Sequence, residues 1–281
     1  MGINLDQGRL RRALMVHHGP MHAQPGVGLR PDTPVGPGQE LDQGREAGAK
    51  GHLPSTTVRS RRSALSKAQR QTWERRWPEL GIQAPAESPR GKPLDTRAWF
   101  GRDAPVVLEI GSGSGSSTLA MALSEPHIDV IAVEVYRRGL AQLLCAIDKV
   151  DSDRINIRLI RGNAVDVLES LIAPDSLCGV RVFFPDPWPK TRHHKRRFLQ
   201  PATVALIADR LVLGGVLHAA TDHPGYAEHI AAVGDAEPRL IRVDPQTEQL
   251  PISVVRPTTK YETKAQHAGS VVTDLFWKKR Q

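Results

Sequence analysis

The chain has 281 residues, of which 40% are hydrophobic, and this is enough for one large domain or two small ones with a substantial core. Its two cysteines, Cys145 and Cys178, lie in apolar surroundings without metal-ligand spacing, which argues against a disulfide framework and predicts free thiols in a reducing compartment. The net charge of +8 favours an acidic partner, most often nucleic acid, although a basic protein without such a partner is an alternative.

No apolar run approaches the roughly 20 residues of a membrane span, and the first residues lack the basic start and apolar centre of a signal peptide. The adjacent His17 and His18 are more often solvated than bound to metal. We therefore expect a cytoplasmic protein without a membrane or metal partner, present as a monomer or a small homo-oligomer.

Residues 1–53 differ in composition from the rest of the chain. They are rich in Gly and Pro, and they lack apolar periodicity except in a short patch at residues 10–16. We predict a disordered N-terminal tail over residues 1–53 and a single domain over residues 54–281.

The domain begins with a basic segment. The arginines of residues 59–62 have no acidic neighbour, so they are as consistent with phosphate contacts as with a solvated charge run. Ser66 can cap a helix in which Trp73 and Trp77 share one face, and Pro78 is expected to end that helix.

A glycine-rich turn follows the first predicted strand, Val106–Ile110. Its run of Val, Leu and Ile is typical of a parallel strand buried on both faces, and a helix is predicted from Ser116 onward. Gly111, Gly113 and Gly115 would let the backbone approach a ligand where a side chain would collide.

The acid Glu109 immediately before this turn indicates which ligand is bound. A dinucleotide fingerprint requires a glycine where Ser116 stands, and an acid is unfavourable beside a pyrophosphate. S-adenosylmethionine carries an ammonium and a sulfonium, which a carboxylate favours, so we predict this cofactor. A glycine turn that binds nothing is the alternative.

Two further strand ends carry polar residues. The second predicted strand, Asp129–Glu134, ends in an acid 25 residues beyond Glu109, and an acid at about this distance bonds the ribose hydroxyls of a cofactor in βαβ folds. Alternatively, Glu134 serves only as an N-cap-like charge before the predicted helix of residues 136–149 and binds no ribose. A third strand over residues 154–160 precedes Asn163, whose amide could contact an adenine amino group.

The next predicted strand ends in the sequence Phe183-Phe184-Pro185-Asp186-Pro187-Trp188. Proline fixes φ and stiffens the chain, so Asp186 should be held at the carboxyl end of the strand, where open α/β sheets place their sites. A purely structural role for Asp186 is the alternative.

A dense basic run follows this candidate catalytic carboxylate. Residues 190–197 contain five cations, two histidines and no acid, which predicts contact with a phosphate backbone. Adjacent histidines in extended chain point in opposite directions, so a metal site here is not expected.

The remaining elements alternate in the same way. A helix is predicted over residues 198–213 with Gly214 and Gly215 as its stop, then a strand over residues 216–222 that ends in Asp222. A helix over residues 226–233, a polar loop at residues 258–264 and a closing strand over residues 271–277 complete the chain.

Taken together, these motifs resemble the bacterial tRNA (guanine-N7-)-methyltransferase family. The resemblance is carried by the glycine loop, by residues 183–188, by the basic run, by Thr221-Asp222 and by Thr259-Lys260-Tyr261-Glu262, and it covers about residues 58–281. It implies an α/β class I methyltransferase fold of the Rossmann-like type, with a mostly parallel seven-stranded sheet and helices on both faces. It also implies methyl transfer from S-adenosylmethionine to N7 of the variable-loop guanine at position 46 of tRNA.

The resemblance implies roles for particular residues. Asp186 would be catalytic. The cofactor would be bound by Glu109, Gly111, Gly113, Gly115, Glu134, Asn163 and Asp186. The substrate would be bound by Lys190, Asp222, Thr259, Lys260, Tyr261 and Glu262, and the RNA by Arg192, His193, His194, Lys195, Arg196 and Arg197. This chain departs from the family at Asn163, where Asp is common, and at Ser112 and Ser114, where bulkier residues are common.

Two other functions are compatible with the sequence. A methyltransferase acting on an exocyclic base amine often carries an Asn/Asp-Pro-Pro-aromatic loop, which Asp186-Pro187-Trp188 approaches. A non-catalytic RNA-binding protein could retain the same fold, although the acids at four strand ends argue against it.

Overall fold

The computed structural model describes residues 64–85, 92–150, 155–257 and 271–281. These residues belong to one compact unit, Gly51–Gln281. The tail predicted over residues 1–53, the arginines of residues 59–62 and the predicted substrate residues 259–262 lie outside the described residues.

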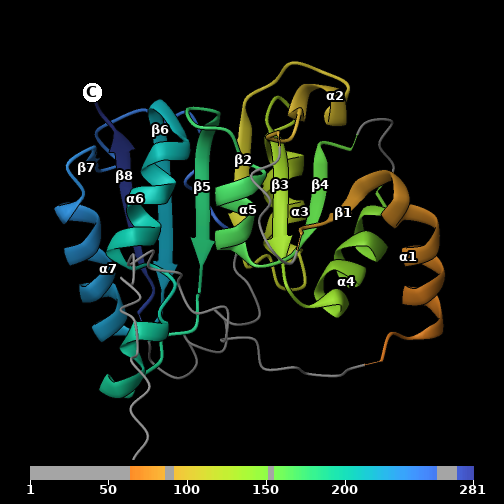
Figure 1. The fold of residues 1–281 in the computed structure, drawn as a ribbon, viewed down its shortest axis with the longest axis horizontal. Coiled ribbons are helices and arrows are strands. Elements are labelled where there is room, and N and C mark those ends of the chain that lie inside the picture. The colour runs from red at the N-terminus through yellow and green to blue at the C-terminus, as the bar shows by residue number, and fades with distance from the viewer. Residues whose placement is uncertain (1–63, 86–91, 151–154, 258–270) are drawn as a thin grey trace, which may run out of the picture. The chain divides into compact units, whose positions relative to one another are not determined.

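The described residues form one eight-stranded sheet with the order β1-β4-β3-β2-β5-β6-β8-β7 (Figure 1). The strands are β1 (Gly81–Gln83), β2 (Val106–Ile110), β3 (Asp129–Glu134), β4 (Ile157–Arg161), β5 (Leu177–Phe183), β6 (Leu211–Thr221), β7 (Leu240–Arg242) and β8 (Thr273–Lys279). Strand β8 is antiparallel to β6 and β7, and the other pairs are parallel. The family resemblance implied seven strands, and the structure has eight among the described residues; the short edge strands β1 and β7 were not located from the sequence.

Helices cover both faces of this sheet, as expected. They are α1 (Lys67–Leu80), α2 (Thr96–Phe100), α3 (Ser116–Ser124), α4 (Arg137–Ile147), α5 (Ala164–Ser170), α6 (Pro201–Arg210) and α7 (Pro224–Ala236), with a 3₁₀ helix η1 (Thr191–Arg196) after β5. Alternate residues of β2 face opposite sides. Leu108 packs in a core with α5, α6 and α7, whereas Val107 packs in a second core with α1, α3 and α4.

The central strands bring the candidate site together. The predicted bounds of β2 and β3 are confirmed, and both strands are buried along their whole length. Ile110 at the end of β2 is paired with Val133 of β3 and Val182 of β5. Because these strands are parallel and in step, the chain segments that follow them leave the sheet at one edge.

Several predicted element boundaries are wrong, and for two of them the structure gives a clear physical reason. Helix α1 continues through Pro78 to Leu80, because the burial of Trp73 and Leu80 and a stack of Trp73 on Trp77, with ring centroids 4.1 Å apart, hold the last turn despite the lost hydrogen bond. Helix α6 ends at Arg210, not at residue 213. The next element, strand β6, begins at Leu211. It includes Gly214, which has φ +79° in the segment where the register between β5 and β6 shifts.

Candidate functional site

The glycine loop after β2 makes a tight turn that requires its glycines. Gly111, Gly113 and Gly115 have φ values of +77°, +58° and +75°, a left-handed region that favours glycine. The N–H groups of Gly111 and Ser112 donate to the carbonyl of Val133 at 2.9 and 3.2 Å, which ties the loop to the end of β3. A Cβ at Gly115 would lie 2.5 Å from the side chain of Leu143 in α4. The predicted turn is confirmed.

The carboxylate of Glu134 organises the same region from the end of β3. Its Oε2 accepts from the Gly113 N–H at 2.9 Å, and its Oε1 accepts from the N–H groups of Val135 and Tyr136 at 2.7 and 3.0 Å. Burial raises the pKa of Glu134 above its ordinary value, and these N–H groups oppose the rise. Oε2 accepts only one of these bonds and keeps a lone pair for a ligand hydroxyl, so Glu134 can hold the loop and bind a ribose together.

Glu109 lies behind the pocket rather than in its wall. Its side chain is only 3% exposed, on the α3 side of β2, and Oε2 has no hydrogen-bond partner among the described residues. Burial raises the pKa of Glu109 to about 7, while neighbouring Thr118 and Arg181 oppose the rise. An orphaned buried carboxylate fits a site for a cation beneath the glycine loop, which suits the donor's ammonium and sulfonium.

Asn163 caps helix α5 as well as lining the pocket. Its Oδ1 accepts from the Val165 N–H at 2.8 Å, which is the usual role of Asn before a helix. The side-chain NH₂ group remains available as a donor, so a ring nitrogen of adenine is a better partner for Asn163 than the amino group that the sequence suggested.

The turn that carries Asp186 is stiffened by proline and contains strained backbone that its surroundings must hold. Phe184 and Trp188, on either side of it, have φ values of +49° and +44°, which non-glycine residues seldom adopt. The Phe184 N–H donates to the carbonyl of Ala220 at the end of β6, at 2.8 Å. The carboxylate of Asp186 is exposed between these fixed points and lies in the pocket wall.

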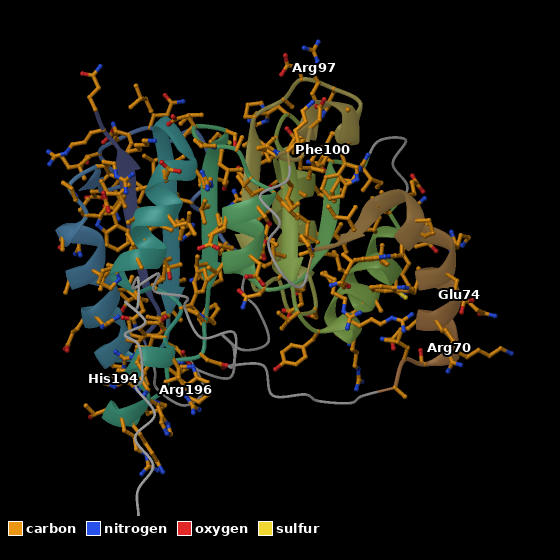
Figure 2. The ribbon with its side chains drawn as sticks, in the orientation of Figure 1. Arg70, Glu74, Arg97, Phe100, His194 and Arg196 are labelled. Atoms are coloured by element: carbon orange, nitrogen blue, oxygen red, sulfur yellow. The ribbon has the colours of Figure 1, made fainter. Side chains whose placement is uncertain are left out.

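The basic run forms η1 beside this turn. Arg192, Lys195 and Arg196 are exposed, and the guanidinium of Arg196 lies 5.1 Å from the ring of Trp188. Figure 2 shows His194 and Arg196 at the carboxyl-end edge of the sheet, whereas Arg97 of α2 lies at the opposite edge. Desolvation and the surrounding cations lower the pKa of His193, so its imidazole is neutral at neutral pH.

Arg197 differs from the rest of the basic run. It is buried, and its guanidinium donates to the carbonyls of Pro187 and Gly225 at 2.9 and 3.2 Å. It also lies 4.8 Å from the ring of Tyr226 in α7. These contacts favour a role in holding the Asp186 turn against α7 rather than the RNA contact that the sequence suggested for Arg197.

A single pocket of about 310 Å³ joins these elements. It brings the predicted cofactor residues Gly111, Glu134, Asn163 and Asp186 together with Lys195, Arg196 and Arg197 of the basic run. Gly113 is tied to this wall through Glu134. Lys190 is exposed before η1, and Asp222 is partly buried after β6; neither lines the pocket.

Several pocket residues carried no sequence signal. Tyr136, Phe198 and Thr203 line the cavity, but their residue types are equally typical of a core. Gly139 of α4 could have been found, because glycine inside a predicted helix indicates close approach. A Cβ at Gly139 would lie 2.1 Å from the carbonyl oxygen of Gly113, so this glycine admits the loop.

Metal-binding clusters and membrane-spanning helices are both absent from the described part of the chain. No cluster of three or more His, Cys, Asp or Glu side chains there is arranged to hold a metal ion. None of the helices described there has the length and apolarity to cross a membrane.

Comparisons with known proteins place the chain among close relatives. A family model described as "Putative methyltransferase" matches residues 103–275. The tRNA (guanine-N(7)-)-methyltransferase of Mycobacterium tuberculosis is 78% identical over 265 residues, covering 94% of this chain and 96% of that protein. The tRNA (guanine-N(7)-)-methyltransferase of Mycobacterium ulcerans is 68% identical over 280 residues, covering 95% of this chain and 100% of that protein. A solved 16S rRNA methyltransferase, KamB, is 14% identical with a TM-score of 0.45 and covers 68% of this chain and 96% of that one.

Proposed function

This chain belongs to the tRNA (guanine-N(7)-)-methyltransferase family, and from that membership we propose that it transfers a methyl group from S-adenosylmethionine to N7 of a guanine in tRNA. We also propose that the guanine is the variable-loop residue at position 46, and that residues 54–281 form the catalytic domain. The observation that carries the proposal is the pocket in which Glu134, Asn163 and Asp186 meet the basic residues of η1.

The donor would be held by groups of three different kinds. Glu134 would accept from the ribose hydroxyls, the Asn163 amide would donate to the adenine ring, and the buried carboxylate of Glu109 would compensate the donor's positive charge. Glycines at positions 111 and 113 leave open space where a Cβ would otherwise stand, with the nearest atom at 4.0 Å or beyond. The bound donor supplies an electrophilic methyl group.

The reaction needs little proton transfer from the protein. N7 of guanine has a free lone pair and no proton, so the protein has to orient the ring and stabilise the positive charge that develops on it. The exposed carboxylate of Asp186 can accept from N1–H or from the exocyclic amine of guanine, which orients the base and offsets that charge. Lys190, Asp222 and residues 259–262 are proposed substrate contacts.

The RNA would reach the pocket over η1. Arg192, Lys195 and Arg196 are exposed cations of η1, and Figure 2 shows Arg196 at the carboxyl-end edge of the sheet. Phosphate contacts of this kind position a nucleic acid without reading its sequence. Arg196 and Lys195 also line the pocket, so a phosphate bound there would lie next to the base that reacts.

The proposal is tested by methyl transfer to unmodified bulk tRNA, with mapping of the product base. Borohydride and aniline treatment should cleave the RNA at one methylated guanine in the variable loop. Incorporated methyl without cleavage would instead indicate an exocyclic amine as the acceptor. A protein that binds tRNA but neither binds labelled S-adenosylmethionine in equilibrium dialysis nor transfers methyl would be a non-catalytic RNA-binding protein.

A further inference from the structure

A charged cluster outside the basic run lies behind the Asp186 turn. The guanidinium of Arg256 donates to both oxygens of Asp274 in β8, at 2.8 and 2.9 Å, and the Arg256 side chain is only 6% exposed. The other partner of Asp274 is His218 of β6, whose Nε2 lies 2.7 Å from the same Oδ1. Three segments of the chain therefore meet in one ion-pair cluster, Arg256–Asp274–His218.

The electrostatics of the cluster fix which groups are charged. Burial lowers the pKa of His218, so the imidazole is neutral and donates from Nε2 to Asp274. Burial alone would raise the pKa of Asp274, but Arg256 and His218 outweigh it and hold that pKa below its ordinary value. The cluster is therefore a fixed Arg⁺–carboxylate pair braced by a neutral imidazole across the physiological pH range.

The same cluster packs against the two residues that lead into the Asp186 turn. The Arg256 guanidinium lies 5.7 Å from the ring of Phe183 and 5.2 Å from the ring of Phe184. The His218 ring meets Phe183 edge-on at 4.8 Å. Both phenylalanines also line the pocket, two and three residues before Asp186.

Phe184 needs such support because its backbone is strained. A non-glycine residue at φ +49° is strained and persists only where its surroundings hold it. The hydrogen bond from Phe184 to Ala220 holds its backbone, and the Arg256 guanidinium holds its ring. Loss of either contact would release the strain and move the turn that carries Asp186.

We propose that Arg256, Asp274 and His218 are positioning residues that fix Phe183 and Phe184 and thereby hold the Asp186 carboxylate in place for methyl transfer. The inference rests on the proposed function and extends it to residues that stand behind the pocket wall and are not among its lining residues. A displacement of about 1 Å at a reacting group can cost on the order of 100-fold in rate, so a contact made behind the turn can control the reaction.

The test compares Arg256→Ala with a matched arginine elsewhere on the sheet. Arg242 of β7 also pairs with a carboxylate, Asp235 at 2.9 Å, and lies over an aromatic ring, Trp277 at 5.3 Å, but it is remote from the pocket wall. The measurement is the single-turnover rate of methyl transfer to unmodified tRNA, with the dissociation constant of S-adenosylmethionine measured in parallel.

We expect Arg256→Ala to lower the single-turnover rate by about tenfold to 100-fold with little change in donor affinity, and Arg256→Lys, which keeps the cation, to recover much of the rate. Arg242→Ala should leave the rate unchanged. Should Arg256→Ala fail to fold, the double variant Arg256→Met with Asp274→Asn removes both charges at similar volume and is expected to be equally slow.

The inference is overturned if a folded Arg256 variant transfers methyl as fast as Arg242→Ala does. It is also overturned if the loss appears only as weaker donor binding. An inactive wild-type protein would instead remove the proposed function itself, so the two failures are distinguishable.

Discussion

At the scale of single residues, we expect Glu109 to link donor binding to pH. Its folded-state pKa of about 7 lies above the ordinary value of 4.5 because burial disfavours the carboxylate. Below the ordinary pKa, the protonated Glu109 contributes to the free energy of unfolding, and this contribution is lost as pH rises from about 4.5 to 7. A cation bound nearby reverses the preference, because it favours the charged form.

We therefore predict that the affinity for S-adenosylmethionine rises with pH up to about 7, by as much as about tenfold per pH unit, and then levels off. Isothermal titration calorimetry across this range, in buffers of different ionisation enthalpy, measures both the affinity and the proton released. Glu109→Gln should flatten the profile. An unchanged slope in that variant would assign the proton to Glu134, whose pKa is also raised.

Asp186 and Arg197 show how far the position and role of a side chain can be predicted from the sequence. The acid between prolines was predicted to sit at a strand end, and it does, because proline spacing and a preceding apolar run are local features. The burial of Arg197 was not predicted, because its partners are the backbone carbonyls of Pro187 and Gly225. Every residue has a backbone carbonyl, so the sequence does not indicate which ones will accept a hydrogen bond from an arginine. Within a run of cations, sequence does not distinguish the one that faces inward.

At the scale of elements, the packing of α4 against the glycine loop controls the shape of the cofactor site. Gly139 permits this contact, since a Cβ there would lie 2.1 Å from the carbonyl oxygen of Gly113. Gly139→Ala should push the loop away from Glu134 and raise the dissociation constant of S-adenosylmethionine by about tenfold or more, which corresponds to one lost hydrogen bond to a charged group.

Equilibrium dialysis with labelled donor measures this effect. Gly225→Ala is the matched control, because a Cβ at that glycine near the start of α7 meets nothing closer than 3.6 Å. Equal affinities in the two variants would mean that the loop is not held by α4.

The second element-scale prediction concerns η1. Arg196→Ala should weaken tRNA binding and reduce the slope of log affinity against log salt by roughly one, as expected for one lost phosphate contact. Arg97→Ala removes an equally exposed arginine from the opposite edge of the sheet and should change neither quantity (Figure 2). A salt series of filter-binding curves measures both slopes, and equal slopes for the two variants would refute the assignment of η1.

Elements with strong periodicity were predicted well, and those decided by tertiary contacts were not. The bounds of β2 and β3 follow from runs of apolar residues that only a doubly covered strand can bury. Strands β1 and β7 have three residues each, too few for a pattern, and exist because they pair with β4 and β8. The sequence predicted Gly214 as a helix stop, but it lies within β6. The register of β6 against β5 shifts in this segment, and the shift requires a residue with positive φ.

At the scale of the whole molecule, the parallel sheet determines where chemistry can occur. Four acidic or amide side chains from distant parts of the sequence follow or end β2, β3, β4 and β5, and the register of those strands delivers them to one edge. Helices cover both faces of the sheet, so a ligand can reach these side chains only at that edge. The ion-pair cluster behind the Asp186 turn could not be predicted, because the pairing of β6 with β8 brings His218 and Asp274 together and Arg256 joins them from a segment outside both strands.

The central claim is that this edge binds the donor and orients a guanine for attack through N7, with Asp186 acting on the base. The most direct measurement is the single-turnover rate of methyl transfer from S-adenosylmethionine to unmodified tRNA by Asp186→Asn, with donor binding measured on the same preparation. Our account predicts donor affinity close to that of the wild type and a rate lower by about 100-fold or more. A rate equal to that of the wild type would contradict it.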